Sequence, residues 1–459
     1  MKNLLITLLF ISILASASGQ SNLTLYNMEP LPQRLQANPA LTPDCKWYLG
    51  MPGVSSFDFN FNSNALAFKS LNNAFTERAG GGYTLSINKL SDALDKQTFV
   101  NVGVNEEWLN FGFRVRKSMF TFGVTEKVKT RIGIPKDVLK LAFQGNGGAN
   151  LGYDFNFNFA IDVLHTREFA LGYSRQFLGD RLTVGGKLKY IRGINVINTA
   201  KNDIIFNTDE NTYAYNVTAD IEANASTPIL DDDLDPLKAV LGSARNTGFG
   251  IDLGAKLDLT KRISVSASVI DLGQINWNDN VTNIKSRNAG ATFQFRGIDI
   301  NDYLSDSVSE GEGFEVLADS LLDVFVLDTF NGSFSTGLLG EFYLGGNIKI
   351  LKKHNAGVLL YGSFYNKQFY PALTLSWNSK FRRAMALSVS YTMMRGSSAN
   401  LGLGMAFNGG PEQIYFVSDN LIGAATGNVK NLSLRFGWNH TFGRRRYENK
   451  EKRKRKSKN

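Results

Sequence analysis

Residues 431–443 read Asn-Leu-Ser-Leu-Arg-Phe-Gly-Trp-Asn-His-Thr-Phe-Gly, and this stretch decides the fold. Apolar side chains occupy one parity and polar side chains the other: Leu432, Leu434, Phe436, Trp438 and Phe442 alternate with Asn431, Ser433, Arg435, Asn439 and Thr441. A period of two is that of a β-strand with one apolar and one polar face. The stretch is typical of the closing strand of a barrel.

The same alternation recurs along most of the chain in segments about ten residues long, the length that a tilted strand needs to cross a hydrocarbon layer. The sharpest copies are 153–162, 249–259 and 384–393. Weaker copies occupy 57–61, 108–116, 169–176, 182–191, 213–221, 263–269, 342–350, 358–364 and 373–377. Short turn signals separate several of them, which predicts antiparallel hairpins. The pattern predicts an all-β fold, a transmembrane antiparallel β-barrel of about 14 strands.

A soluble β-sandwich also alternates and is the alternative. Its strands are typically about 5 to 6 residues long, and its core favours Val, Ile and Leu over repeated Phe and Tyr. Here the segments are longer and aromatic residues make up 12% of the chain. Tyr and Trp gather near segment ends, where an interfacial girdle places them. These features favour the membrane barrel over a secreted soluble protein.

The N-terminus predicts export. Lys2 precedes an apolar run at 4–15 and a small-residue stretch at 15–19, which together resemble a secretory signal with the mature chain starting near Gln20. No later run of eighteen apolar residues predicts a membrane helix, so insertion must use strands. The single cysteine, Cys45, permits no internal disulfide and lies too far along for lipidation. We interpret Cys45 as a small, buried apolar residue, and a reactive thiol is the alternative interpretation.

The net charge of +9 is concentrated at the two ends of the chain. Lys2 supplies +1, and residues 444–459, with ten Lys or Arg and two Glu, supply +8. The body is therefore neutral. Three long connections stand out: 62–107, with a helix-like stretch at 85–94; 223–245, with three consecutive Asp at 231–233; and the acidic 299–328. Long loops of such barrels face outside, so these connections are candidates for surface contacts.

Two local motifs carry a family resemblance. Residues 31–41 read Leu-Pro-Gln-Arg-Leu-Gln-Ala-Asn-Pro-Ala-Leu, with Tyr-Leu-Gly-Met-Pro-Gly at 48–53; residues 268–277 read Ser-Val-Ile-Asp-Leu-Gly-Gln-Ile-Asn-Trp. Both resemble a Bacteroidetes-type outer-membrane family of unknown function, itself similar to FadL-type and PorV-like barrels. The resemblance spans nearly the whole mature chain up to Phe442. The basic residues after Gly443 depart from the family pattern, because such barrels end near their final aromatic residue.

The resemblance implies an N-terminal hatch folded into the lumen of a 14-stranded barrel in the cell outer membrane. Asn38, Pro39 and Ala40 match the hatch signature. The short Asn38 amide can bond nearby backbone and Pro39 fixes φ, which suits a rigid turn; an ordinary loop turn is the alternative. The chain is thus expected to divide into a signal peptide (1–19), a hatch (20–52), a barrel (53–443) and a basic periplasmic tail (444–459).

Charged residues on the inward parity are candidates for lining a conduit or binding the hatch: Asp154, Asp162, Asp252, Lys256, Asp258, Lys349 and Arg435. The alternative is that they only satisfy one another, because a barrel this wide has a polar interior whatever crosses it. His165, His354 and His440 lack companions at ligand spacing, so no metal site is predicted. No serine lies in a G-x-S-x-G elbow, and we expect neither catalytic residues nor a cofactor.

Two functions are consistent with the resemblance. The first is a FadL-like conduit for small, hydrophobic molecules, which predicts a lateral opening or a kinked strand joined to an apolar pocket. The second is a non-transporting scaffold for an exported or surface protein, related to type IX secretion, that uses the acidic loops or the basic tail. Export argues against nucleic acid as the partner of the tail; acidic partners, anionic lipid, or no specific partner remain.

Overall fold

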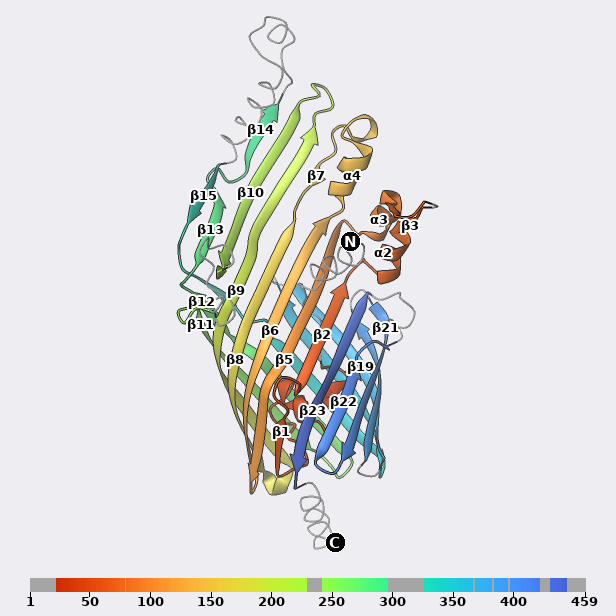
Figure 1. Ribbon diagram of the computed structural model, residues 1–459, viewed down its shortest axis with the longest axis vertical. Helices are drawn as coiled ribbons and strands as arrows, with labels where there is room; N and C mark the ends of the chain where they lie inside the picture. The colour runs from red at the N-terminus through yellow and green to blue at the C-terminus, as the bar shows by residue number, and fades with distance from the viewer. Residues whose placement is uncertain are drawn as a thin grey trace, which may run out of the picture.

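The computed structural model describes residues 22–78, 80–228, 242–295, 326–365, 368–381, 384–394, 397–421 and 430–443. The predicted signal peptide and basic tail lie outside these residues. The chain forms a closed barrel with short turns at one rim and a tall extension above the other (Figure 1).

Within the described residues the wall has fourteen strand positions, all antiparallel to their neighbours. In order round the barrel they are β1 (Trp47–Gly50) with β2 (Ser56–Ser63) as one position, β5 (Gln97–Val115), β6 (Ser118–Pro135), β8 (Ala160–Phe177), β9 (Leu182–Thr208), β11 (Thr247–Asp258), β12 (Ile263–Trp277), β17 (Glu341–Leu351), β18 (His354–Tyr365), β19 (Gln368–Phe381), β20 (Met385–Met394), β21 (Ser397–Gly409), β22 (Glu412–Ser418) and β23 (Asn431–Phe442). The predicted fold class is confirmed.

The last strand closes the wall. β23 pairs with β1 in the register Trp47↔Phe442 and with β2 in the register Phe57↔Phe436. The rings of Trp47 and Phe442 stack with centroids 3.8 Å apart. Closure leaves no strand edge in the wall, as a sheet in hydrocarbon requires.

The two faces of β23 differ as the alternation predicts. Phe436 is 49% exposed and Trp438 is 37% exposed, whereas Arg435 and Asn439 are buried. The apolar face of the strand therefore points outward to lipid and the polar face points into the lumen. No helix among the described residues is both long and apolar enough to span a bilayer.

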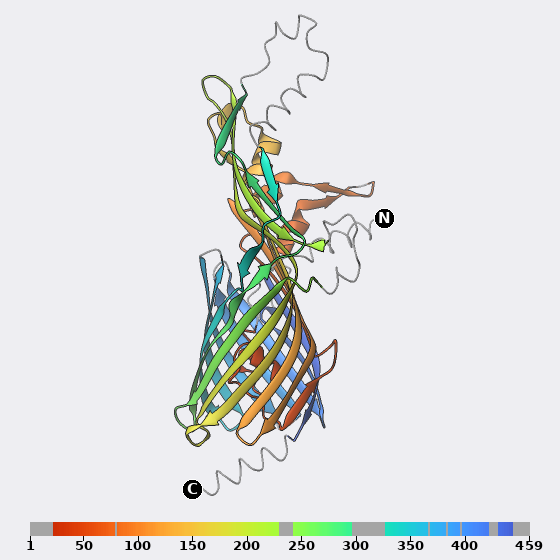
Figure 2. The ribbon, with the colours of Figure 1, turned by 90° about the vertical axis from the view of Figure 1, so that its left-hand side faces the viewer.

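An extension rises above the rim that carries the long connections (Figures 1 and 2). The upper half of β9 pairs with β10, β10 pairs with β13 and β14, and β13 pairs with β15. The extension and its neighbours comprise α2 (Phe68–Ala74), β3 (Phe75–Glu77), β4 (Tyr83–Leu85), α3 (Ile87–Ala93), α4 (Asp137–Gln144), η3 (Gly148–Asn150), β7 (Phe155–Asn156), β10 (Tyr215–Ser226), β13 (Val281–Ser286), β14 (Ala291–Phe295), β15 (Leu327–Phe330) and β16 (Phe334–Gly337).

Two predicted wall strands prove wrong. The segment 153–162 holds only the two-residue β7 before β8 begins at Ala160, and 213–221 becomes β10 of the extension. Their alternation does not mark a wall strand or a uniformly covered face, because Tyr213 and Tyr215 are exposed in the extension. Three wall strands, β6, β21 and β22, were not among the predicted segments. The helix predicted at 85–94 is confirmed as α3.

Among the irregularities of the described wall, two lie beside buried carboxylates of the lumen. Residues 51–55 leave the wall between β1 and β2, opposite a bulge of β5 between Glu107 and Leu109. A second irregularity crosses three neighbours: the register of β11 and β12 shifts between Ile251 and Leu253, and residues 338–340 separate β16 from β17. Interrupted pairing bends a strand and re-aims its side chains.

Residues 22–46, called the N-terminal segment below, fill the lumen (Figure 2). The wall begins at Trp47, so this segment ends about six residues before the predicted hatch boundary. It contains η1 (Leu25–Asn27) and η2 (Pro32–Gln36). Glycines of the wall make room for it, because a Cβ at any of them would lie against the segment: Gly185, Gly254, Gly345, Gly357, Gly402 and Gly404.

Adjacent glycines of β9 provide a test of this packing. A methyl group at Gly185 would lie 2.6 Å from the carbonyl oxygen of Pro39, whereas at Gly186, on the other face, the nearest outside atom is 3.4 Å away. We expect Gly185→Ala to loosen the N-terminal segment and Gly186→Ala to leave it docked. Cys45 is buried at the end of the segment and is the only cysteine, so its maleimide labelling rate reports docking.

Labelling of Cys45 should be at least about tenfold faster in Gly185→Ala than in wild type, the ratio for about 1.4 kcal/mol of local opening. The Gly186→Ala rate should equal wild type. Equal rates in all three proteins would contradict the packing described.

Candidate functional site

Hydrogen bonds cross the lumen between the N-terminal segment and well-separated parts of the wall. The backbone N–H of Thr24 donates to Asp419 Oδ1 (2.7 Å), and Asn27 Nδ2 donates to Ser376 Oγ (3.0 Å). The hydroxyls of Tyr26 and Ser266 lie 2.9 Å apart. The segment is thus bonded to both sides of the barrel and separates the two rims.

Asn38, Pro39 and Ala40 form a buried turn at the wall. The Asn38 Oδ1 accepts from the Ala40 N–H (2.9 Å), while Nδ2 donates to the Tyr26 hydroxyl (3.1 Å) and to the Ala267 carbonyl (3.2 Å). The amide therefore satisfies its own turn and ties it to β12. Its chemistry is structural.

Glu29 anchors the other side of the N-terminal segment. Its carboxylate pairs with the Lys380 ammonium of β19. That ammonium holds the pKa of the Glu29 carboxyl well below its usual range, although burial acts in the opposite direction. The pair accordingly stabilises docking above the carboxyl's unfolded pKa of about 4.3 and is lost only in stronger acid.

Two glutamines of η2 bind a buried carboxylate of the wall. Gln33 Nε2 donates to Glu107 Oε2 (3.2 Å), and Gln36 Nε2 donates to Glu107 Oε1 (2.6 Å). Arg435 donates to Gln36 Oε1 (2.7 Å) and pairs with Asp58 at 2.7 Å. We call Gln33, Gln36 and Glu107 the amide latch.

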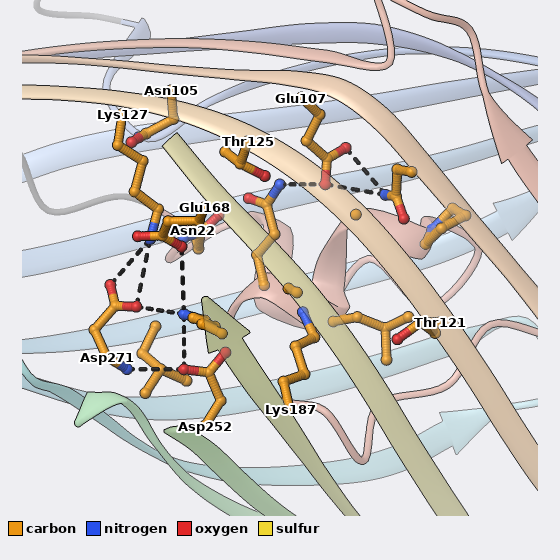
Figure 3. A pocket seen from close by; sticks show the side chains of 18 of the residues that line it. Asn22, Asn105, Glu107, Thr121, Thr125, Lys127, Glu168, Lys187, Asp252 and Asp271 are labelled. Atoms are coloured by element: carbon orange, nitrogen blue, oxygen red, sulfur yellow. Dashed lines mark hydrogen bonds and ion pairs between the residues drawn. The ribbon is translucent and has the colours of Figure 1, made fainter. Parts of the chain in front are cut away.

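Above the latch, five charged side chains form a continuous belt across neighbouring strands β6, β8, β9, β11 and β12 (Figure 3). Lys127 Nζ lies 2.8 Å from Glu168 and 3.1 Å from Asp271. Lys189 Nζ lies 2.8 Å from Asp252 and also pairs with Asp271. All except the partly buried Lys127 are nearly inaccessible. The belt thus holds two ammonium groups and three carboxylates, a formal net charge of −1.

A bulge turns Asp271 into this belt. Ser268 and Ile270 are buried on the even parity of β12, whereas Ile275 and Trp277 are buried on the odd parity. Asp271 has φ 57° at the change of parity, and its N–H donates to Asp252 Oδ1 (2.8 Å). Strict alternation would have pointed this carboxylate at lipid.

The belt borders a cavity of about 90 Å³ between the wall and the N-terminal segment. Its charged lining consists of Lys127, Lys129, Lys187, Lys189 and Arg435 with Glu107, Glu168, Asp252, Asp271 and Glu341. Cations and carboxylates are equal in number. The cavity is polar and electrically balanced, so it suits water or a small polar group.

A second pocket, of about 360 Å³, lies higher, at the mouth of the lumen. Leu164, Val196, Leu339 and Phe364 contribute apolar surface to it, and Lys129 borders both this mouth pocket and the inner cavity. Beside it, Leu164 and Val196 belong to a larger apolar group around the buried Trp277. The mouth pocket is thus amphipathic, whereas the inner cavity is polar.

Comparison with protein families gives one match over most of the chain. Residues 39–419 match a family of unknown function, DUF5723. The chain belongs to this family. No curated protein matches the sequence.

Solved structures share the overall trace of this DUF5723 protein at low identity. The Pseudomonas putida toluene transporter TodX is 9% identical with a TM-score of 0.43, covering 89% of this chain and 93% of that one. A Pseudomonas aeruginosa FadL homologue is 10% identical (TM-score 0.42; 94% and 99% covered), and the Ralstonia pickettii toluene transporter TbuX is 9% identical (TM-score 0.40; 91% and 100%).

The predicted site residues of the DUF5723 chain fall into separate groups. Asp252 and Arg435 line the inner cavity and Asp162 lines the mouth pocket. Lys256, which pairs with Asp258 at 3.3 Å, and Lys349 lie near the short-turn rim. Asp154 is exposed in the extension, where Asn207 donates to it at 2.9 Å, so its assignment to the lumen was wrong.

Sequence reasoning missed most of the belt and the latch. Lys127 lies on β6, which was not predicted, and Asp271 lies on a bulge. Glu168 and Lys189 follow the polar parity of their strands and were detectable from it. The histidines each bond locally, for example His165 to Glu126 (2.6 Å) and His440 to Glu412 (2.8 Å). The described residues contain no group of three or more ligating side chains placed to hold a metal ion.

Removing one cation should leave the belt with one ammonium group against three carboxylates. Lys189→Met leaves Asp252 and Asp271 without their shared ammonium, and an uncompensated buried charge costs about 3–5 kcal/mol. Lys187, two residues away on β9, lines the same cavity and has no ion pair with any described residue. We expect thermal unfolding in detergent to fall clearly for Lys189→Met and little for Lys187→Met. Equal losses would contradict the belt.

Proposed function

We propose that the protein is a gated conduit of the outer membrane for small, largely hydrophobic molecules that carry a polar or anionic end. The N-terminal segment is its gate. The single observation that carries the proposal is the mouth pocket, which shares Lys129 with the polar cavity directly above that segment.

The chemistry of the mouth pocket supports this class of solute. Its volume of about 360 Å³ falls in the usual range of small-molecule sites. Leu164, Val196 and Leu339 offer an apolar surface to the body of a solute. Lys129 and Arg131 offer positive charge to an anionic end, and Arg131 is held in place over the Phe99 ring, with its guanidinium carbon 3.8 Å from the centroid.

The amide latch is suited to reversible opening. Gln33 and Gln36 each donate a hydrogen bond to the Glu107 carboxylate, and a hydrogen bond to a charged group contributes about 1.5–3 kcal/mol. Opening them exposes Glu107 to water entering from the polar cavity, so its charge is not stranded. A solute that displaces η2 therefore meets a moderate barrier.

The wall offers two exits beyond the latch. Residues 51–55 leave the sheet beside Glu107, and Ser55 donates to that carboxylate at 3.0 Å. The irregularity at β11, β12 and residues 338–340 lies beside the belt. A lateral route through either place avoids the full length of the plugged lumen.

Weakening the latch should open the conduit. Gln33→Ala/Gln36→Ala is expected to raise the entry of naphthalene-2-sulfonate, a permanent amphipathic anion, into proteoliposomes by about tenfold, the ratio for about 1.4 kcal/mol. The control Gln144→Ala/Gln294→Ala removes two exposed glutamines of the extension. Lys129→Gln should lower entry of the anion and leave entry of uncharged glucose unchanged. Equal flux in all variants and in protein-free vesicles would refute the proposal.

A scaffold for an exported or surface protein is the second candidate, favoured by the extension. Tyr213 at its tip is 65% exposed and Phe330 on β15 is 50% exposed. Crosslinking should then recover a stoichiometric partner that Tyr213→Ser/Phe330→Ser loses. The acidic 299–328 lies almost wholly outside the described residues and the basic tail lies fully outside them, and deletion of each tests its predicted contribution.

A further inference from the structure

Basic side chains are concentrated at the rim that carries the short turns. Six turns join wall strands there, and their described residues include seven Lys or Arg and one Asp. The described basic residues, called the basic rim below, are Arg116, Lys117, Arg181, Lys261, Arg262, Lys352 and Lys353, all exposed. Short turns face the periplasm in bacterial outer-membrane barrels, so the basic rim is periplasmic.

Contacts join neighbouring turns of the basic rim. Lys117 pairs with Asp180 at 3.1 Å, and Arg181 Nη2 donates to the Leu259 carbonyl at 2.6 Å. These contacts neutralise the one acidic residue and fix the spacing of three consecutive turns. The cations therefore form an arc along the rim rather than separate points.

A hollow of about 520 Å³ continues the positive surface. Arg262, Lys349, Lys352 and Lys353 line it, and the Glu29–Lys380 pair, which is internally balanced, closes its inner side. The C-terminal strand ends at the same rim, so the ten Lys or Arg of residues 444–459 follow in sequence from this place.

A long connection of the sequence is acidic. Residues 299–328, in a long connection, contain nine Asp or Glu and no Lys or Arg. The neutral charge of the body is therefore the sum of basic and acidic stretches of the sequence.

We propose that the basic rim binds the phosphate groups of anionic phospholipids in the periplasmic leaflet. The turns are two to four residues long, so their cations stay within a few residues of outward-facing Phe113, Phe177 and Leu351, which mark the edge of the apolar wall. The cations recur on turns round much of the circumference. A leaflet is an anionic surface that meets all these turns at once, whereas a compact acidic protein would contact only a few.

Local electrostatics support selective retention of anionic lipid. Each Lys or Arg near an anionic membrane surface adds attraction that falls off within a Debye length. Phosphatidylglycerol and phosphatidylcholine share their acyl chains but differ in net charge, so a preference for the former isolates the headgroup. Higher salt should reduce that preference.

The test compares full-length variants in nanodiscs of phosphatidylcholine with about one fifth phosphatidylglycerol, by native mass spectrometry of retained lipid. Arg116→Gln/Lys117→Gln/Lys261→Gln/Arg262→Gln/Lys352→Gln/Lys353→Gln should lower the preference for phosphatidylglycerol at least about tenfold. The matched control replaces six exposed cations on the other side of the membrane with Gln: Lys69, Arg78, Lys89, Lys96, Lys201 and Lys285. It should retain the wild-type preference.

Each outcome decides the proposal. Loss of preference in the rim variant alone supports it, and because the tail is intact in every protein, that loss cannot come from residues 444–459. Equal preference in all three proteins overturns it. A soluble poly-glutamate peptide provides the arm for an acidic protein. If this peptide binds wild type as tightly as phosphatidylglycerol does and loses binding equally in the rim variant, the lipid assignment is overturned. The conduit proposal stands or falls separately, because its solute never touches this rim.

Discussion

Closure of the sheet by β23 is the constraint on which the rest of the structure depends. A backbone N–H or C=O without a partner in hydrocarbon costs several kcal/mol, so a wall of strands must have no free edge. The pairing of β23 with both β1 and β2 meets that demand and stacks Trp47 on Phe442. Once the wall is closed, every strand has one face toward lipid and one toward an enclosed space.

The polar side chains that face the enclosed space then need hydrogen-bond or ion-pair partners. Polar side chains of the inner face are cut off from bulk solvent and need partners, and the N-terminal segment supplies many of them through Tyr26, Asn27 and Asn38. Wall glycines give it room, as at Gly185. Where the N-terminal segment supplies no partner, charged side chains of the wall form ion pairs with one another, as in the belt of Lys127, Lys189 and their carboxylates. The mouth pocket, with its apolar surface, begins where this balanced interior ends.

The fold followed from the sequence because lipid imposes a period of two over long stretches. Phe436 and Trp438 against Arg435 and Asn439 suffice to orient β23. The same period misled at 153–162 and 213–221, because a strand outside the membrane has the same period of two as a strand that crosses it. The site was less accessible to sequence reasoning. Asp271 enters the lumen only through a positive φ on a bulge. Gln36 bonds to both Glu107 and Arg435, which lie far apart in sequence and are brought together by closure of the barrel.

The central claim is that one parity of the wall meets lipid and the other meets the lumen, and adjacent residues of β17 test it at one depth. Leu344 is 53% exposed and Tyr343 is 1% exposed. In a background with all five tryptophans replaced by Phe, a single tryptophan is introduced as Leu344→Trp or Tyr343→Trp, and its quenching by brominated phospholipid is measured. The account predicts strong quenching for Leu344→Trp and little for Tyr343→Trp. Equal quenching at the two positions, or quenching at neither, would contradict it.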